Sequence, residues 1–278
     1  MIFSSYRSKE RNEGRKKIAA ILENRDDVFT IHYACESFDA SNTPRITSIS
    51  IQNLSTGESK SFNLHVEALK KQYDINRLTK VELDASERAL LQNFYKFVKA
   101  QKCSWVHWNM KNSKYGFDAL KNRYEILNPQ KTAPNIRIQD RYDLSLLLKK
   151  LYGSTFETCE TKGKLLNLAR RNCFPLEGML TGRREADAFD KKDFQAVMAS
   201  SQAKAETIGL IAKAAGENRL KVATSIIEIY GMNAQGFLLC VLDHSSKIGK
   251  IASAIGGLFT LLNLVSLKTI YNFIIQHF

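Results

Sequence analysis

The spacing of apolar residues changes early in the chain from a helical to a strand-like pattern. Residues 7–25 place Ile18, Ile21 and Leu22 on one side and basic residues on another, which predicts a basic amphipathic helix. After Asp27, the segments VFTIHYAC, RITSISIQNL and KSFNLHV have a β-rich pattern and are separated by short turns. Three consecutive strands joined in this way predict an antiparallel meander.

Helices and strands alternate in the middle of the chain. We expect a helix in ERALLQNFYKFVKAQ, opened by Ser86, then a short strand in CSWVHWNM and a helix in YGFDALKNRYEIL. Three further segments are helical in period: RYDLSLLLKKLYG, GKLLNLARRN and DFQAVMASSQAKAETIGLIAKAAG. This order predicts an α/β fold, a mixed sheet flanked by helices, over residues 26–216, after a basic N-terminal helix in residues 1–25.

The last part of the chain is poor in charge, because residues 219–278 contain only five basic and two acidic side chains. Two nearly uncharged blocks, VATSIIEIYGMNAQGFLLCVL and IASAIGGLFTLLNLVSL, are separated by a polar turn, and the second runs for 17 residues without a charge. That length is close to what crosses the hydrocarbon core of a bilayer. We predict an all-helical hydrophobic hairpin in residues 217–278, with membrane contact through 222–278. A pair of buried helices and a homo-oligomer interface are the alternatives.

The chain is strongly basic, with 41 Lys and Arg against 28 Asp and Glu and a formal charge of +13. Such a field attracts polyanions, either nucleic acid or an anionic membrane surface. Residues 219–278 account for only +3 of this charge, five basic minus two acidic residues. The body is therefore expected to bind nucleic acid, DNA or RNA, and membrane attraction is left to the apolar tail.

Cysteine use and missing motifs narrow the class further. The five cysteines are scattered without a Cys-x-x-Cys pair, which favours reduced thiols and a cytoplasmic location, with inner-membrane association through the tail as a further expectation. The first residues are too charged for a secretory signal. The sequence has no P-loop, dinucleotide-binding glycine motif, nucleophile elbow or His-Glu-x-x-His motif, which argues against these enzyme classes.

The most informative run is Ala34-Cys35-Glu36 at the end of the first β segment, with RITSISI about ten residues later. It resembles the first motif of the DEDD-type 3′–5′ exonucleases of the ribonuclease H-like superfamily, in which an Asp-x-Glu lies on strand one. Ala34 takes the Asp position, and Glu36 is kept. A cage of carboxylates holds two divalent ions in that family. The resemblance therefore implies Glu36 as a metal ligand, and Mg²⁺ or Mn²⁺ as the cofactor if the protein is a nuclease.

A second run resembles the next motif of that family. His107-Trp108-Asn109 and, after a loop, Phe117-Asp118 match an Asn or His that is followed by a Phe-Asp opening a helix. The resemblance implies Asp118 as a second metal-linked carboxylate. The alternative is an acidic residue that favours the helix dipole without any metal.

The third motif of the family is degenerate in this sequence. Gln195 stands in place of its His, and Ser200 stands in place of its Asp. Neither side chain can act as a general base. The resemblance implies a ribonuclease H-like fold over residues 26 to about 212, with an incomplete catalytic set.

Two histidines extend the candidate catalytic set. His32 and Glu36 are four residues apart on one predicted strand, so they face the same side. If the strand that carries His107 lies next to the strand of His32, four side chains could form one mixed cluster: His32, Glu36, His107 and Asp118. Such a cluster suits Mn²⁺ or Zn²⁺ binding, or acid–base chemistry. The alternative is that both histidines are neutral, hydrogen-bonded core residues.

Aromatic and basic residues alternate around the second motif, a pattern that suits base stacking combined with phosphate contacts. Core packing is the alternative for the aromatic side chains. A further basic pair follows Gly182. The candidate nucleic-acid-binding residues are Trp108, Lys111, Lys114, Tyr115, Arg123, Arg183 and Arg184.

These observations predict a nucleic-acid-binding, catalytically degenerate exonuclease-like protein with a membrane-active C-terminal hairpin. A sensor joined to a membrane-active segment fits a phage-defence effector by architectural analogy. Two alternatives stay open. One is an active metal-dependent 3′–5′ exonuclease that uses Glu36 and Asp118, and the other is a soluble oligomeric interaction protein.

Overall fold

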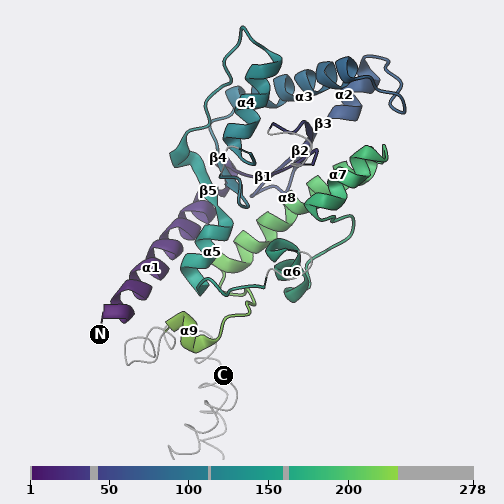
Figure 1. Cartoon of the computed structure of the whole chain (residues 1–278). Helices are drawn as coiled ribbons and strands as arrows, with labels where there is room; N and C mark the ends of the chain where they lie inside the picture. Colours follow the sequence, from purple (N-terminus) through teal and green to yellow (C-terminus); the bar gives the residue numbers. More distant parts are fainter. Residues whose placement is uncertain (1, 38–42, 112–113, 159–162, 231–278) are drawn as a thin grey trace, which may run out of the picture. The chain divides into compact units, whose positions relative to one another are not determined.

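The computed structural model of the chain describes residues 2–37, 43–111, 114–158 and 163–230 (Figure 1). Contacts divide the chain into two units, Lys9–Ser225 on the one hand and Met1–Ser8 with Ile226–Phe278 on the other. The sheet and every candidate site residue belong to the unit Lys9–Ser225.

A five-stranded mixed sheet forms the centre of this unit, with the strand order β3-β2-β1-β4-β5. The strands are β1 (Val28–Cys35), β2 (Ile46–Asn53), β3 (Ser59–Asn63), β4 (Ser104–His107) and β5 (Arg141–Asp143). β2 pairs antiparallel with β1 and β3, whereas β1, β4 and β5 pair in parallel. The predicted mixed sheet and its antiparallel meander are therefore confirmed, and of these five strands β2 runs against the other four.

The central strands are buried on both faces, which explains their strand-rich composition. Ile31 on β1 is opposite Ile51 on β2, and Ile49 is opposite Tyr33. All four side chains are at most 1% exposed. Branched and aromatic residues pack well on a pleated surface, so this run of residues favours strands over helix.

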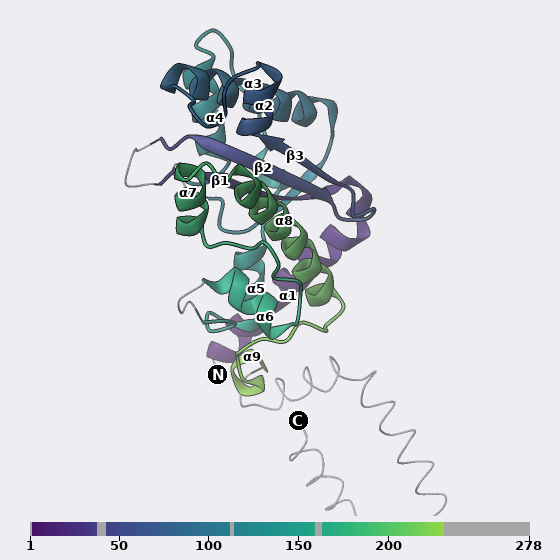
Figure 2. The same cartoon turned by 90° about the vertical axis from the view of Figure 1, so that its right-hand side faces the viewer.

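Helices cover both faces of the sheet (Figures 1 and 2). α2 to α4 lie on one face, and α7 and α8 lie on the other. The helices are α1 (Ile2–Glu23), α2 (Leu64–Lys70), α3 (Lys80–Ala100), α4 (Phe117–Leu127), α5 (Leu144–Tyr152), α6 (Lys164–Arg171), α7 (Gly182–Asp190), α8 (Phe194–Gly216) and α9 (Ile226–Tyr230). Short 3₁₀ turns are η1 (Arg25–Asp27) and η2 (Ile138–Asp140).

Some element boundaries differ from the prediction. The helix expected to open at Ser86 begins at Lys80, because the Thr79 hydroxyl accepts a hydrogen bond from Glu82 N while the Glu82 carboxylate accepts one from Thr79 N. The end of the predicted strand KSFNLHV forms α2, whose Leu64 and Ala68 are fully buried. β5 and α7 were not predicted.

α1 packs closely against the C-terminal end of α8. Ile18 and Ile21 of α1 are buried, and a Cβ atom added at Gly216 would overlap Cδ1 of Leu22. The two helices approach so closely because Gly216 has no side chain. The predicted basic N-terminal helix is therefore anchored to the body of the protein.

Most of the predicted hydrophobic hairpin lies outside the described residues, because the description ends at residue 230. Within the residues that the structure describes, no helix is both long and apolar enough to cross a membrane. The hairpin in 217–278 and the membrane contact through 222–278 stay predictions.

Candidate functional site

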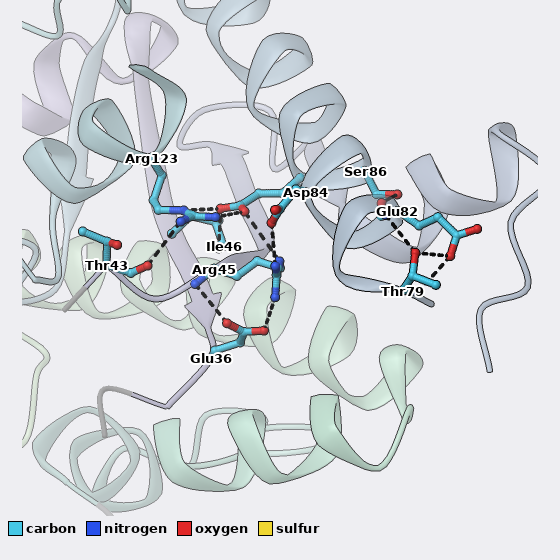
Figure 3. A network of polar contacts seen from close by, with 10 residues as sticks. Glu36, Thr43, Arg45, Ile46, Thr79, Glu82, Asp84, Ser86 and Arg123 are labelled. Carbon is cyan, nitrogen blue, oxygen red and sulfur yellow. Dashed lines mark hydrogen bonds and ion pairs between the residues drawn. The ribbon is translucent and has the colours of Figure 1, made fainter. Parts of the chain in front are cut away.

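Glu36 directly follows β1 and belongs to a network of carboxylates and arginines (Figure 3). Arg45 Nη1 lies 2.5 Å from Glu36 Oε1, and Arg45 Nη2 lies 2.6 Å from Asp84 Oδ1. The backbone N–H of Arg45 also donates to Glu36. The carboxylate of Glu36 is therefore occupied by a guanidinium group and a backbone donor.

The buried centre of this network is Glu87 on α3, whose side chain is 0% exposed. Its carboxylate accepts hydrogen bonds from the backbone N–H of Ile46 and from Nε of Arg123, both at 2.8 Å. Arg123 also donates to the backbone oxygen of Thr43. These contacts connect α3 and α4 with the start of β2.

Asp118 lies apart from this network. It is in the first turn of α4, its side chain is 64% exposed, and it pairs with Arg141 at 3.4 Å. The Arg141 guanidinium in turn lies over the Phe117 ring, 4.9 Å from its centroid. This placement matches the alternative expectation of an acidic residue at a helix N-terminus.

His107 ends β4 and is buried. Its Nδ1 accepts a hydrogen bond from the backbone N–H of Met110 at 3.2 Å, and its ring stands edge-on to Phe117. Burial lowers the pKa of His107 to about 4, because desolvation outweighs the opposite effect of Asp143. His107 is therefore a neutral acceptor at pH 7.

His32 belongs to a different buried cluster, formed between β1, α7 and α8. Lys204 Nζ lies 2.7 Å from Glu185 Oε1, and their side chains are 4% and 3% exposed. His32 Nε2 lies 3.8 Å from the same oxygen. Burial and the nearby Lys204 charge lower the pKa of His32. Although burial acts to raise the pKa of Glu185, it is lowered because His32 and the Lys204 ammonium lie beside the carboxylate.

Hydroxyl groups complete this cluster. Ser200 Oγ donates to Glu185 at 2.6 Å and accepts a hydrogen bond from Leu180 N. The Tyr115 hydroxyl lies 3.3 Å from His32 Nδ1 and donates to the backbone oxygen of Tyr33. The interior next to β1 therefore contains a hydrogen-bonded ion pair between Glu185 and Lys204.

The four predicted catalytic residues do not come together as one site. His32 lies in the buried cluster of Lys204 and Glu185, and Glu36 lies in the network around Arg45. His107 lies at the end of β4, and Asp118 lies in the exposed first turn of α4. Among the described residues, no group of three or more His, Cys, Asp or Glu is arranged to hold a metal ion. The expected convergence of His32, Glu36, His107 and Asp118 is therefore not seen, and the metal roles of Glu36 and Asp118 stay predictions.

Three of the predicted nucleic-acid-binding residues contact the interior. The Trp108 ring packs edge-on against Phe156, with centroids 6.3 Å apart. The Tyr115 ring stacks on Tyr33 at 4.5 Å. Arg123 is held by the buried Glu87. Core packing, the alternative stated for the aromatic residues, describes both rings.

The other four predicted residues are exposed: Lys111, Lys114, Arg183 and Arg184. Lys111 is 3.3 Å from Asp143. Lys114 directly precedes Tyr115, and Arg184 directly precedes Glu185. Because Tyr115 and Glu185 both contact His32, these two cations belong to segments that both reach His32. We call Lys111, Lys114, Arg183 and Arg184 the basic rim.

Sequence reasoning missed Arg45, Glu87, Glu185 and Lys204, although two of them left a signal. Lys204 occupies the buried stripe of α8 at helical spacing from Val197, Ser200 and Ile208, and Glu87 precedes the buried Leu90 and Leu91 on α3 in the same way. A charged residue inside an apolar stripe indicates a buried partner. The partner itself cannot be read from the stripe.

No protein-family model matches this sequence, and no curated protein is detectably similar to it.

Proposed function

We propose that residues 26–216 form a ribonuclease H-like, exonuclease-related domain that binds nucleic acid without hydrolysing it. A five-stranded mixed sheet in which only the second strand is reversed is the sheet arrangement of that superfamily, and the strand order supports this proposal. Glu36 follows β1, and Asp118 opens the helix after β4, in the order that the resemblance implies.

The observation that favours binding over catalysis is the buried ion pair of Lys204 and Glu185. The resemblance assigns carboxylates to positions 34 and 200, where this chain has a buried alanine and a buried serine. Lys204 is one helical turn after Ser200 on the same helix. Two divalent ions need an anionic cage, and an ammonium group close to that cage repels them. The ammonium instead neutralises the Glu185 carboxylate.

The basic rim supplies contacts for a phosphate backbone. Arg183 and Arg184 lie in the first turn of α7, and neither has an ion-pair partner among the described residues. Lysine and arginine side chains give affinity for phosphates without reading base sequence. Because Trp108 and Tyr115 pack in the interior, stacking on these rings does not contribute. The domain is therefore expected to bind DNA or RNA strands with little sequence preference.

The test is a titration of the full chain with fluorescently labelled single-stranded DNA and RNA in EDTA, from about 50 to 200 mM salt. The expected result is binding whose logarithm falls linearly with the logarithm of salt concentration. Replacing the EDTA with Mg²⁺ should not strengthen binding, because the divalent cation only competes with lysine and arginine side chains for the phosphates. Absence of binding at the lowest salt, or binding that requires Mg²⁺, would contradict the proposal.

The nuclease alternative is tested in parallel with labelled strands in Mg²⁺ or Mn²⁺. We expect neither the natural chain nor a Glu36→Ala variant to shorten the strands. Metal-dependent shortening that the Glu36→Ala variant lacks would favour the metal-dependent 3′–5′ exonuclease instead. Equal shortening by both proteins would indicate a contaminant.

The membrane-active tail belongs to the same proposal, since a nucleic-acid sensor joined to a membrane-active segment fits a phage-defence effector. The length and low charge of 251–267 support it. Ala223 N still bonds Phe156 O in the body, so the informative truncation follows Ser225. Flotation with anionic vesicles that is lost on truncation supports membrane contact. A change of assembly state without flotation supports the soluble oligomer.

A further inference from the structure

A cavity of about 480 Å³ opens at the end of the sheet where β1 and β4 begin. Residues from the end of α3, from the segment before β1 and from the segment before β5 surround it. Glu36 and His107 follow or end the same two strands at their opposite ends. Eight residues of β1 span roughly 26 Å at about 3.3 Å per residue, so this cavity is separate from the basic rim.

The cavity has an apolar wall. Val28, Val98, Trp105 and Ile136 line it and are otherwise buried, at 2% to 9% exposed. These side chains come from β1, α3, β4 and the segment before β5, so the wall is fixed by regular structure on three sides. A volume of this size is in the range of small-molecule sites, about 300–1,000 Å³. An apolar group of a ligand would be removed from water here.

The charged groups of the cavity divide into a paired set and an unpaired set. Arg137 and Asp140 satisfy each other through two hydrogen bonds of 2.6 and 3.1 Å. Asp27 and Lys102 also line the cavity, and neither side chain has a hydrogen-bond or ion-pair partner among the residues that the structure describes. The site therefore offers one carboxylate and one ammonium group to a ligand.

The cysteine in the cavity is unsuited to covalent chemistry. Burial, together with the nearby carboxylates of Asp140 and Asp27, raises the pKa of Cys103 to about 12. A thiol that stays protonated at pH 7 is a poor nucleophile and a poor metal ligand. The cavity is therefore suited to reversible binding.

We propose that this cavity binds a small zwitterion with an apolar side chain, of the amino-acid or dipeptide class. Asp27 receives the ammonium group of the ligand, Lys102 receives its carboxylate, and the apolar wall around Trp105 receives its side chain. The cavity offers one unpaired ammonium group and one unpaired carboxylate, so a ligand without net charge matches both.

The test is isothermal titration calorimetry of the full chain with L-phenylalanine and with the dipeptide alanyl-phenylalanine, which separates the two ligand sizes. Phenethylamine and 3-phenylpropionate each carry one of the two charges, and each should bind at least about tenfold more weakly than the better zwitterion. Asp27→Asn and Lys102→Met should each weaken zwitterion binding by about tenfold or more. The matched controls Asp26→Asn and Lys99→Met change exposed neighbours outside the cavity lining and should leave affinity unchanged.

The proposal fails if neither zwitterion binds to the protein in a sample that circular dichroism shows to be folded. It also fails if a half-ligand binds as tightly as the zwitterion, or if Asp27→Asn and Lys102→Met keep the natural affinity. Adenosine monophosphate is the competing probe, and its binding in preference to both zwitterions would identify a nucleotide site instead. None of these outcomes depends on whether the basic rim binds nucleic acid.

Discussion

Nζ of Lys204 lies 2.7 Å from Oε1 of Glu185 in the interior of the protein, and the side chains are 4% and 3% exposed. A buried pair of this kind contributes little beyond what an apolar pair of similar volume would, but each charge depends on the other. Removing one partner leaves a charge that water cannot reach. The cluster therefore fixes α7 and α8 to β1 and makes each residue in it hard to replace singly.

Lys204→Met should lower the free energy of unfolding by about 3–5 kcal/mol, because Glu185 then remains buried without its counter-ion. The double variant Lys204→Met/Glu185→Leu should regain most of this loss. Urea unfolding followed by circular dichroism measures both effects. Lys213→Met, at a partly exposed position of the same helix, is the control and should change stability by less than about 0.5 kcal/mol. Equal losses for the single and double variants would contradict a paired charge.

His107 should make stability depend on acidity. Its pKa in the folded protein is lowered by burial to about 4, below its ordinary value of 6.5, so the folded state binds the proton less readily than the unfolded state does. The stabilisation is complete above pH 6.5 and is lost as the pH falls from 6.5 through 4, by on the order of 3 kcal/mol. His107→Asn retains an acceptor for Met110 N but cannot titrate. The difference in free energy of unfolding between the natural chain and His107→Asn should therefore shrink as the pH falls. A difference that stays constant with pH would refute this role.

Arg183→Gln/Arg184→Gln should weaken strand binding for all sequences alike. Removing one cation that neutralises a phosphate lowers the slope of log affinity against log salt by about 0.7 for single strands, so the double variant should reduce it by about 1.4. Fluorescence anisotropy across a salt series measures the slope. The control Lys96→Gln/Lys99→Gln removes two exposed charges from α3, on the other face of the sheet from α7 and α8. It should leave the slope of log affinity against log salt unchanged. A slope that both double variants reduce equally would point to net charge rather than to the basic rim.

Glu87 and Glu36 should differ in their effect on stability, although both contact Arg45. Glu87 is fully buried and also holds Arg123, so Glu87→Ala should cost about 3–5 kcal/mol. Glu36 is 24% exposed, and Glu36→Ala should cost about 1 kcal/mol or less. Urea midpoints with unchanged slopes provide the comparison. Similar costs would mean that solvent reaches both carboxylates to the same degree.

A side chain at Gly216 should displace Leu22 of α1. Gly216→Ala places a methyl group onto Leu22 of α1 and should cost about 1–3 kcal/mol. Combining it with Leu22→Ala removes the overlap, so the double variant should be less unstable than the sum of the single variants predicts. Gly182→Ala is a suitable control, since a Cβ there meets no other atom within 4 Å. Strict additivity would show that the helices do not meet at this point.

Local sequence pattern was sufficient to predict the meander. VFTIHYAC coincides with β1, and the strand pairing follows from short turns between neighbouring segments. β5 was missed because its three residues precede the helical run of α5 and carry no periodicity of their own. The start of α3 was misplaced because Thr79 and Glu82, three residues apart, form the cap, which an apolar pattern does not record.

The site was harder to predict because its contacts join residues that are far apart in the sequence. Glu36 was identified as a carboxylate at the end of a strand, but its partner Arg45 and the buried Glu87 decide what it does. Likewise, nothing near Ser200 in the sequence indicates that Glu185 folds back onto it. Charges in apolar stripes show that such partners exist, and only the tertiary structure identifies them.

The Arg45 network also has a consequence for how the chain can vary. Glu36 precedes residues 38–42 and Arg45 follows them, and Arg123 holds Thr43 from a separate helix. The Glu36–Arg45 contact and the hydrogen bond from Arg123 thus hold the two ends of this connection together. Closing a longer connection adds only a few tenths of a kcal/mol for each modest extension. Residues can therefore be gained or lost between β1 and β2 without shifting the strands, which makes this connection the natural place for a tag, a reporter or an inserted recognition loop.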